Sequence, residues 1–188
     1  MLIGIAGPTA SGKTTVTEIF TNEYDAAYMR YSQILSGIAK ERDLDPTDKA
    51  TLQNLYVSLR DERGENWLAQ EIAERAKTLA SEHLVIEGNR RKVDLDTLQE
   101  VAKARNEKLV FIFVDASPDT RFVRYNTRLE KQNKPPITHK SFTTLEQNPA
   151  EDEVDDLRQY AKAHGIYIDT DEYGIEEVKE LVRGKLNI

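Results

Sequence analysis

The chain has 188 residues, 39% of them hydrophobic, which is enough for one compact domain with a buried core and leaves little length for a second. Its formal net charge of −7 argues against a surface built throughout to bind nucleic acid, although it allows a local basic cleft. The absence of cysteine excludes disulfides, thiolate metal sites and thiol nucleophiles.

Short apolar runs alternate with longer segments of helical period, a pattern typical of a parallel sheet covered by helices. Strands are predicted at residues 2–6, 26–30, 84–87, 109–115 and 166–169. The first run has no basic flank and leads straight into a glycine loop, so it predicts a buried strand, and we expect a cytoplasmic protein without a membrane partner. The whole of residues 1–188 is expected to form a single α/β domain.

A long insertion, residues 31–83, separates the second and third predicted strands. Its apolar periodicity predicts three helices. The first break falls at residues 43–46, with Thr47 resembling a helix cap, and the second falls at Gly64.

The strongest motif is GPTASGKT at residues 7–14, which matches G-x-x-x-x-G-K-[ST] in full and lies between a predicted strand and a predicted helix. Glycines allow a tight turn whose backbone N–H groups face one anion, and the helix adds the positive end of its dipole. We expect ATP and Mg²⁺ as cofactors, with Lys13 on the β- and γ-phosphates and Thr14 on the metal. The residues predicted to hold the nucleotide are Gly7, Ala10, Ser11, Gly12, Lys13, Thr14 and Thr15.

The remaining signatures argue against a GTPase. The Asn-Lys pair at residues 133–134 is followed by two prolines and lacks the aspartate of the guanine-selecting N-K-x-D segment. DERG at residues 61–64 spells D-x-x-G, but it follows a helical pattern rather than a strand.

Further motifs follow the phosphate loop: YS at 31–32, LR at 59–60 with Gly64, EGNR at 87–90, SPDTR at 117–121 and a loop at 169–174 before a last helix. With them the chain resembles the nucleoside and deoxynucleoside monophosphate kinases related to adenylate kinase, with dephospho-CoA kinase as a neighbour. The resemblance implies a three-layer P-loop kinase fold with a five-stranded parallel sheet and helices on both faces. In such kinases the insertion binds the acceptor, an arginine-rich segment closes as a lid, here residues 117–148, and the last loop borders adenine.

Three arginines in the lid region, Arg121, Arg124 and Arg128, share one face of a helix that Ser117 caps and Pro118 begins. Residues 121–140 carry six basic side chains and one acid in a protein that is acidic overall. Because arginine supplies planar donors to a transferring phosphoryl group, we expect the three arginines to act in catalysis. The side chains expected to face elsewhere, toward the core, are Phe122, Tyr125 and Leu129.

The resemblance also implies residues for the acceptor and the metal. Ser32 and Arg90 stand at positions that would bind the acceptor. Arg60 is a further candidate, with an ordinary surface ion pair as its alternative, and Arg30 has less support. Glu87, where the family usually has aspartate, would bind metal or order water together with Thr14.

The lack of an acidic residue after the second predicted strand indicates the chemical class of the acceptor. A hydroxyl acceptor needs a carboxylate to take its proton, whereas a phosphate acceptor is already anionic. No acid stands at residues 29–33, where dephospho-CoA kinase-like enzymes place an aspartate, so a (deoxy)nucleoside monophosphate is the expected small-molecule partner. Glu87 or Asp115 could still serve as base.

Two other functions stay open at this point. One is a hydroxyl kinase acting on dephospho-CoA or on a hydroxymethylated base or polynucleotide, which would make DNA a partner. The other is a nucleotide-dependent switch or binding module. Either a monomer or a homodimer is compatible with the sequence.

Overall fold

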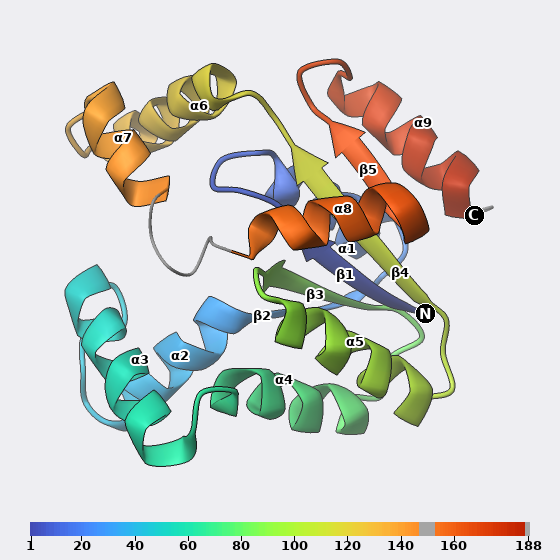
Figure 1. Ribbon diagram of the computed structural model, residues 1–188, viewed down its shortest axis with the longest axis horizontal. Coiled ribbons are helices and arrows are strands. Elements are labelled where there is room, and N and C mark those ends of the chain that lie inside the picture. The colour runs from blue at the N-terminus through green and yellow to red at the C-terminus, as the bar shows by residue number, and fades with distance from the viewer. Residues whose placement is uncertain (147–152, 187–188) are drawn as a thin grey trace.

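In a computed structural model that describes residues 1–146 and 153–186, the chain folds around a parallel sheet (Figure 1). Its strands are β1 (Leu2–Ala6), β2 (Ala27–Arg30), β3 (Leu84–Asn89), β4 (Leu109–Asp115) and β5 (Ile166–Asp169), in the order β2-β3-β1-β4-β5. β2 begins one residue later than predicted. β3 continues past Glu87 because Asn89 pairs with Ala6 after a shift in register.

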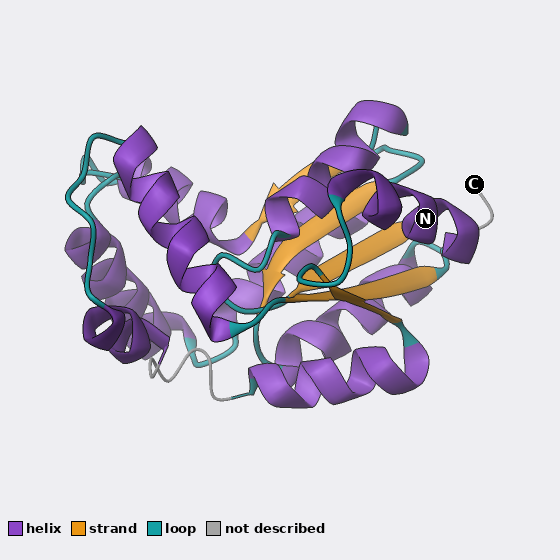
Figure 2. Cartoon of the chain, turned by 90° about the horizontal axis from the view of Figure 1, so that it is seen from above, coloured by secondary structure: helices purple, strands orange, loops and turns teal. Residues whose placement is uncertain are grey.

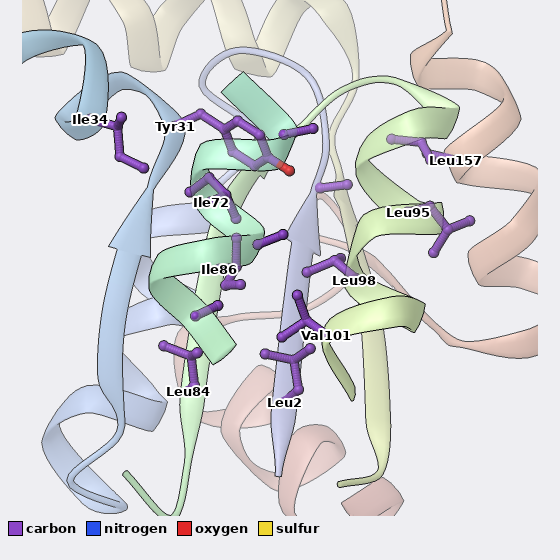
Figure 3. Close-up of a cluster of buried hydrophobic side chains, with 14 of the residues drawn as sticks. Leu2, Tyr31, Ile34, Ile72, Leu84, Ile86, Leu95, Leu98, Val101 and Leu157 are labelled. Atoms are coloured by element: carbon purple, nitrogen blue, oxygen red, sulfur yellow. The ribbon is translucent and has the colours of Figure 1, made fainter. Parts of the chain in front are cut away.

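Helices cover both faces of the sheet, as predicted (Figure 2). Four of these helices are α1 (Lys13–Glu23), α5 (Lys92–Ala104), α8 (Val154–His164) and α9 (Ile175–Leu186). Alternate residues of a strand point to opposite faces, so Ile3 and Ile5 of β1 pack with α1 and α9, whereas Leu2 packs with α5 and α8 on the other face. Figure 3 shows this second core, with Leu2 beside Val101 of α5. Within the described part of the chain, no helix is long and apolar enough to cross a membrane.

The insertion consists of three helices, as predicted: α2 (Tyr31–Glu41), α3 (Lys49–Arg63) and α4 (Trp67–Thr78). Gly64 ends α3, but the cap of α3 is Asp48, whose carboxylate accepts the backbone N–H of Thr51 at 2.8 Å. The prediction of Thr47 as cap is wrong because Thr47 lies in a turn, where its own N–H donates to Asp45.

The region predicted as a lid contains α6 (Pro118–Lys131) and α7 (His139–Glu146); its residues 147 and 148 lie outside the described part of the chain. Ser117 caps α6 through the N–H of Thr120, and Pro118 begins it, as predicted. The pair α6–α7 and the pair α2–α3 both extend past the carboxyl ends of the strands, on the same side of the molecule (Figures 1 and 2).

Candidate active site

The phosphate loop joins β1 to α1, and its backbone requires glycine at two positions. Gly7 has φ of +142°, and a Cβ there would lie 2.1 Å from the backbone oxygen of Val114 in β4. Gly12, with φ of +104°, directly precedes α1, so the loop ends at the positive end of the helix dipole. The loop therefore has the close-fitting backbone that an anion-binding turn needs.

Two side chains of this loop are suited to phosphate. Ser11 is fully buried, and its Oγ has no hydrogen-bond partner among the described residues, so a polar ligand atom would satisfy it. The Nζ of Lys13 donates to the backbone oxygens of Gly7 at 2.8 Å and Pro8 at 2.6 Å. Burial, followed by the charge of Arg90, lowers the pKa of Lys13 to about 7. A bound triphosphate would place negative charge beside this partly buried amine and so favour its charged form.

The loop opens into a cavity of about 520 Å³ at the carboxyl ends of β2 and β3. Its lining comes from the loop, from the start of α2, from the end of β3 and from α6. Cationic side chains dominate the lining, and Glu87 is the one carboxylate among the lining residues. The cations are Lys13, Arg30, Arg90, Arg124 and Arg128. A site of this composition favours ligands that carry several negative charges.

Glu87 is held in place by neighbours on two elements. Its side chain is 1% exposed, and its Oε2 accepts the hydroxyl of Tyr28 in β2 at 2.7 Å and that of Thr17 in α1 at 3.5 Å. The other carboxylate oxygen lies 3.9 Å from the Nε of Arg30, its partner in the β2–β3 register. Burial, together with the bond to Glu87, raises the pKa of Tyr28, so this hydroxyl stays a donor.

The segment after Glu87 carries Arg90 to the cavity. The Nδ2 of Asn89 donates to the backbone oxygen of Ile5 at 3.0 Å and so ties the end of β3 to β1. The buried Oδ2 of Asp94 accepts the backbone N–H groups of Arg90 at 2.9 Å and Arg91 at 3.0 Å. Burial, and next the charge of Arg30, lowers the pKa of Arg90. An anion between the two guanidinium groups would relieve their repulsion.

Two of the three predicted lid arginines line the cavity. Arg124 donates to Thr170 and to the backbone oxygen of Ser11, and Arg128 lies over the ring of Tyr125, 4.9 Å from its centroid. Tyr125 also lines the cavity instead of facing the main core. It packs on Phe142 of α7, so the aromatic side of α6 forms a small core between α6 and α7.

The placement of Arg121 corrects the expectation that all three arginines converge. Arg121 is 7% exposed, its Nε donates to the backbone oxygen of Ala116 at 3.0 Å, and its guanidinium pairs with Glu146 at the end of α7. It lies outside the cavity lining. Helical spacing predicts which way a side chain points, but not that a carboxylate from another helix will bind it.

The acceptor candidates also divide. Two of them line the cavity: Ser32 at the start of α2, and Arg90 directly after β3. Arg60 does not: it is exposed on α3 and pairs with Asp61 at 3.2 Å, which is the alternative that its sequence context left open. In the phosphate loop, Ala10 to Thr14 line the cavity, while Gly7 is not among the lining residues. Thr15 follows on α1 without lining it.

Asp115, the alternative base, binds side chains outside the cavity. Its Oδ2 accepts the Nε of Arg158 at 2.7 Å and the hydroxyl of Tyr167 at 3.1 Å, and it is absent from the cavity lining. Glu87 is therefore the carboxylate that the structure places at the site.

Several site residues were not predicted. Tyr28 and Thr17 contact Glu87, and Thr170 contacts Arg124. The register of β2 against β3 would have identified Tyr28 and would have strengthened the case for Arg30, since both lie on the face of the sheet that carries Glu87. Thr170 lies in the predicted loop at 169–174, but no local signal indicates its contact with Arg124.

A phosphate loop between β1 and α1, and a cation-lined cavity beyond the carboxyl ends of the strands, define a P-loop protein. The family model described as "AAA domain" matches residues 6–143, and the chain belongs to this family. The search of curated proteins gave no significant match.

Two kinase structures share the fold. A gluconokinase from Sinorhizobium meliloti 1021 is 19% identical with a TM-score of 0.57, and the alignment covers 98% of this chain and 91% of that one. A shikimate kinase from Bacteroides thetaiotaomicron is 18% identical with a TM-score of 0.51, covering 100% and 99%. The predicted P-loop family and the three-layer fold are confirmed, because the family model covers the phosphate loop and both structures share the fold.

Proposed function

We propose that the protein is an ATP-dependent kinase that transfers the γ-phosphoryl group to a small phosphate-bearing acceptor, with a (deoxy)nucleoside monophosphate as the expected one. The observation that carries this proposal is the continuity of the cavity. It runs from the phosphate loop to Ser32, Arg30 and Arg90 without an intervening wall of protein. Donor and acceptor phosphates therefore have room on one connected surface.

The charge of the cavity supports a phosphate on the acceptor. Five cations and one carboxylate line it, so the lining carries a clear excess of positive charge. A phosphomonoester brings about −1.5 to −2 charges at pH 7, which complements this excess together with the phosphates of the donor. An uncharged sugar or alcohol would add no complementary charge.

The residues then divide the work of the transfer. Ser11 and the loop backbone bind the donor phosphates, and Lys13, Arg124 and Arg128 place positive charge around the transferring group. Arg30 and Arg90 orient the acceptor phosphate, which needs no base because its oxygen is already anionic. Thr14 and Glu87 are the residues that would hold Mg²⁺, which, when bound, neutralises phosphate charge.

The experiment that tests the proposal is coupled ADP release with ATP and Mg²⁺ over all ribo- and deoxynucleoside monophosphates, with Lys13→Ala as blank. We expect one or a few monophosphates to stimulate turnover. Arg90→Ala should raise the acceptor KM by roughly 10-fold or more, because an arginine–phosphate contact is charge-assisted. Arg60→Ala, which removes an arginine outside the cavity, is the matched control and should change little. Turnover that ignores every monophosphate contradicts the proposal.

A hydroxyl kinase is the second candidate, because Glu87 lines the cavity and could take a proton. The structures that share the fold include proteins named gluconokinase and shikimate kinase. Against it, both carboxylate oxygens of Glu87 already have partners: Oε2 accepts the hydroxyl of Tyr28, and Oε1 lies 3.9 Å from the Nε of Arg30. Stimulation by dephospho-CoA or by hydroxymethylated DNA, and not by monophosphates, would favour this candidate.

A further inference from the structure

We infer that Thr170, the first residue after β5, is a positioning residue that fixes Arg124 of α6 against the phosphate loop. The inference rests on the proposed function, in which Arg124 contacts the phosphates of the bound nucleotide. It assigns a task to one residue of the 169–174 loop between β5 and α9, which the sequence indicated only as a border of the adenine site.

Thr170 binds Arg124 at two points. Its Oγ1 accepts the Nη1 of Arg124 at 2.7 Å, and its backbone oxygen accepts the Nη2 at 3.1 Å. A guanidinium held through both terminal nitrogens cannot rotate freely, because each bond fixes the plane of the fork. The side chain of Arg124 is therefore oriented before any ligand arrives.

The same hydroxyl reaches the phosphate loop. Thr170 Oγ1 lies 2.9 Å from the backbone oxygen of Ser11 and 3.0 Å from that of Asp115, so its one proton has an acceptor in either direction while its lone pairs receive Arg124. The methyl group of Thr170 faces the loop as well, since a Cβ built on Gly12 would lie 3.5 Å from Cγ2. Both branches of this threonine thus contact the nucleotide-binding loop or its support.

Hydrogen bonds also anchor the loop between β5 and α9, and they fix the position of Thr170. The backbone N–H of Thr170 donates to the oxygen of Asp115 at 2.9 Å, which continues the pairing of β5 with β4. One residue further on, the carboxylate of Asp171 accepts the N–H of Ser117, the cap of α6, at 2.7 Å. Thr170 therefore stands on the rigid sheet and connects it to the lid helix and to the phosphate loop.

A positioning role predicts an effect that passes through Arg124. Loss of the hydroxyl leaves the fold and the Arg124 side chain intact, but it removes one of the two hydrogen bonds that orient the guanidinium. The guanidinium can then move, which weakens its contact with phosphate. By contrast, the buried hydroxyl of Thr97 donates to the backbone oxygen of Val93 within α5, away from the cavity, at 2.7 Å. Thr97→Val is thus a matched control for the loss of a threonine hydroxyl.

The test measures ATP affinity by calorimetry and kcat/KM for ATP in Thr170→Val, Thr170→Ser and Thr97→Val, each also checked by thermal melting. We expect Thr170→Val to weaken ATP binding and to lower kcat/KM by roughly 10- to 100-fold, the size of a hydrogen bond to a charged group. Thr170→Ser, which keeps the hydroxyl, and Thr97→Val should stay within about threefold of the unmodified protein.

A double-mutant cycle separates positioning from a general structural effect. In an Arg124→Ala background, Thr170→Val should cost less than about threefold, because the group that it positions is gone. The inference is overturned if Thr170→Val binds ATP as the unmodified protein does, or if it costs as much without Arg124 as with it. Failure of the proposed function is a different result: the unmodified protein would bind ATP without acceptor-stimulated turnover, and the affinity series would still decide on Thr170.

Discussion

The pKa of Lys13 lies in a range where proton uptake on nucleotide binding can be measured. Burial, with the charge of Arg90 as the next cause, lowers its pKa from 10.5 to about 7, so at pH 8 most of the free protein carries an uncharged amine. A bound triphosphate favours the ammonium form and raises this pKa again. Binding of ATP at pH 8 should therefore take up close to one proton, and less at pH 6, where the amine is already charged.

Calorimetry of ATP binding at pH 8 in two buffers with different ionisation enthalpies measures this uptake. The apparent enthalpy should depend on the buffer, and ATP affinity should fall by up to about tenfold per unit above pH 7. Lys13→Met should bind ATP weakly and lose most of the proton uptake. An enthalpy that does not change with the buffer would contradict the assignment.

Tyr28 tests the orientation of Glu87. Tyr28→Phe removes the 2.7 Å hydrogen bond to the carboxylate, and we expect kcat to fall roughly tenfold, because a bond to a charged group is worth about 1.5–3 kcal/mol. Tyr167→Phe removes a comparable bond of 3.1 Å to Asp115, outside the cavity, and should leave kcat unchanged. Steady-state kinetics of both variants decide the matter: equal losses would mean that the effect of Tyr28 is not specific to the site.

The sequence predicted site residues correctly where their position depends on the local backbone. It did so less well where their position depends on contacts with distant parts of the chain. The run from Ala10 to Thr14 lines the cavity because the loop motif fixes its own geometry. Arg60 and Arg121 were also predicted and lie elsewhere, each bound to an acid. A side chain on a helix chooses between solvent, an ion pair and a ligand according to what other elements bring near it, which no local motif encodes.

Among the elements, α6 carries one arginine in an ion pair with α7 and another at the cavity. Arg121→Ala breaks a partly buried ion pair between α6 and α7, and we expect it to lower the free energy of unfolding by about 2 kcal/mol. Arg128→Ala removes an exposed side chain from the cavity rim, so it should change stability by less than about 0.5 kcal/mol. Its expected effect is a loss of about 100-fold in kcat.

Urea denaturation and steady-state kinetics on the same two variants separate these roles. An Arg121→Ala protein with unchanged stability and little activity would place Arg121 at the phosphates after all. A stable Arg128→Ala protein with full activity would remove Arg128 from the transfer.

The boundaries of the elements were largely predictable from hydrophobic pattern and punctuation. β1, β4 and β5 have their predicted bounds because each is a short apolar run between polar segments. The cap of α3 was misplaced by one residue, since Thr47 and Asp48 are both good capping residues and only the turn at Asp45 decides between them.

On the scale of the whole molecule, the order of the strands creates the site. β3 lies between β1 and β2, so the phosphate loop, Glu87 and Arg30 meet at one edge of the sheet although 57 positions separate Arg30 from Glu87 in the sequence. Periodicity identifies strands but not their neighbours in the sheet, so this convergence could be expected only from the resemblance to known kinases. The contacts of α6 with the loop after β5 depend on the same long-range arrangement.

A phosphate-bearing acceptor can be tested by following the transfer of label from γ-labelled ATP, with Lys13→Ala as blank. We expect the label to appear in the diphosphate formed from one or a few (deoxy)nucleoside monophosphates, and the corresponding unphosphorylated nucleosides to receive none. Label that reaches only a hydroxyl compound, or only inorganic phosphate, would contradict a phosphate-bearing acceptor.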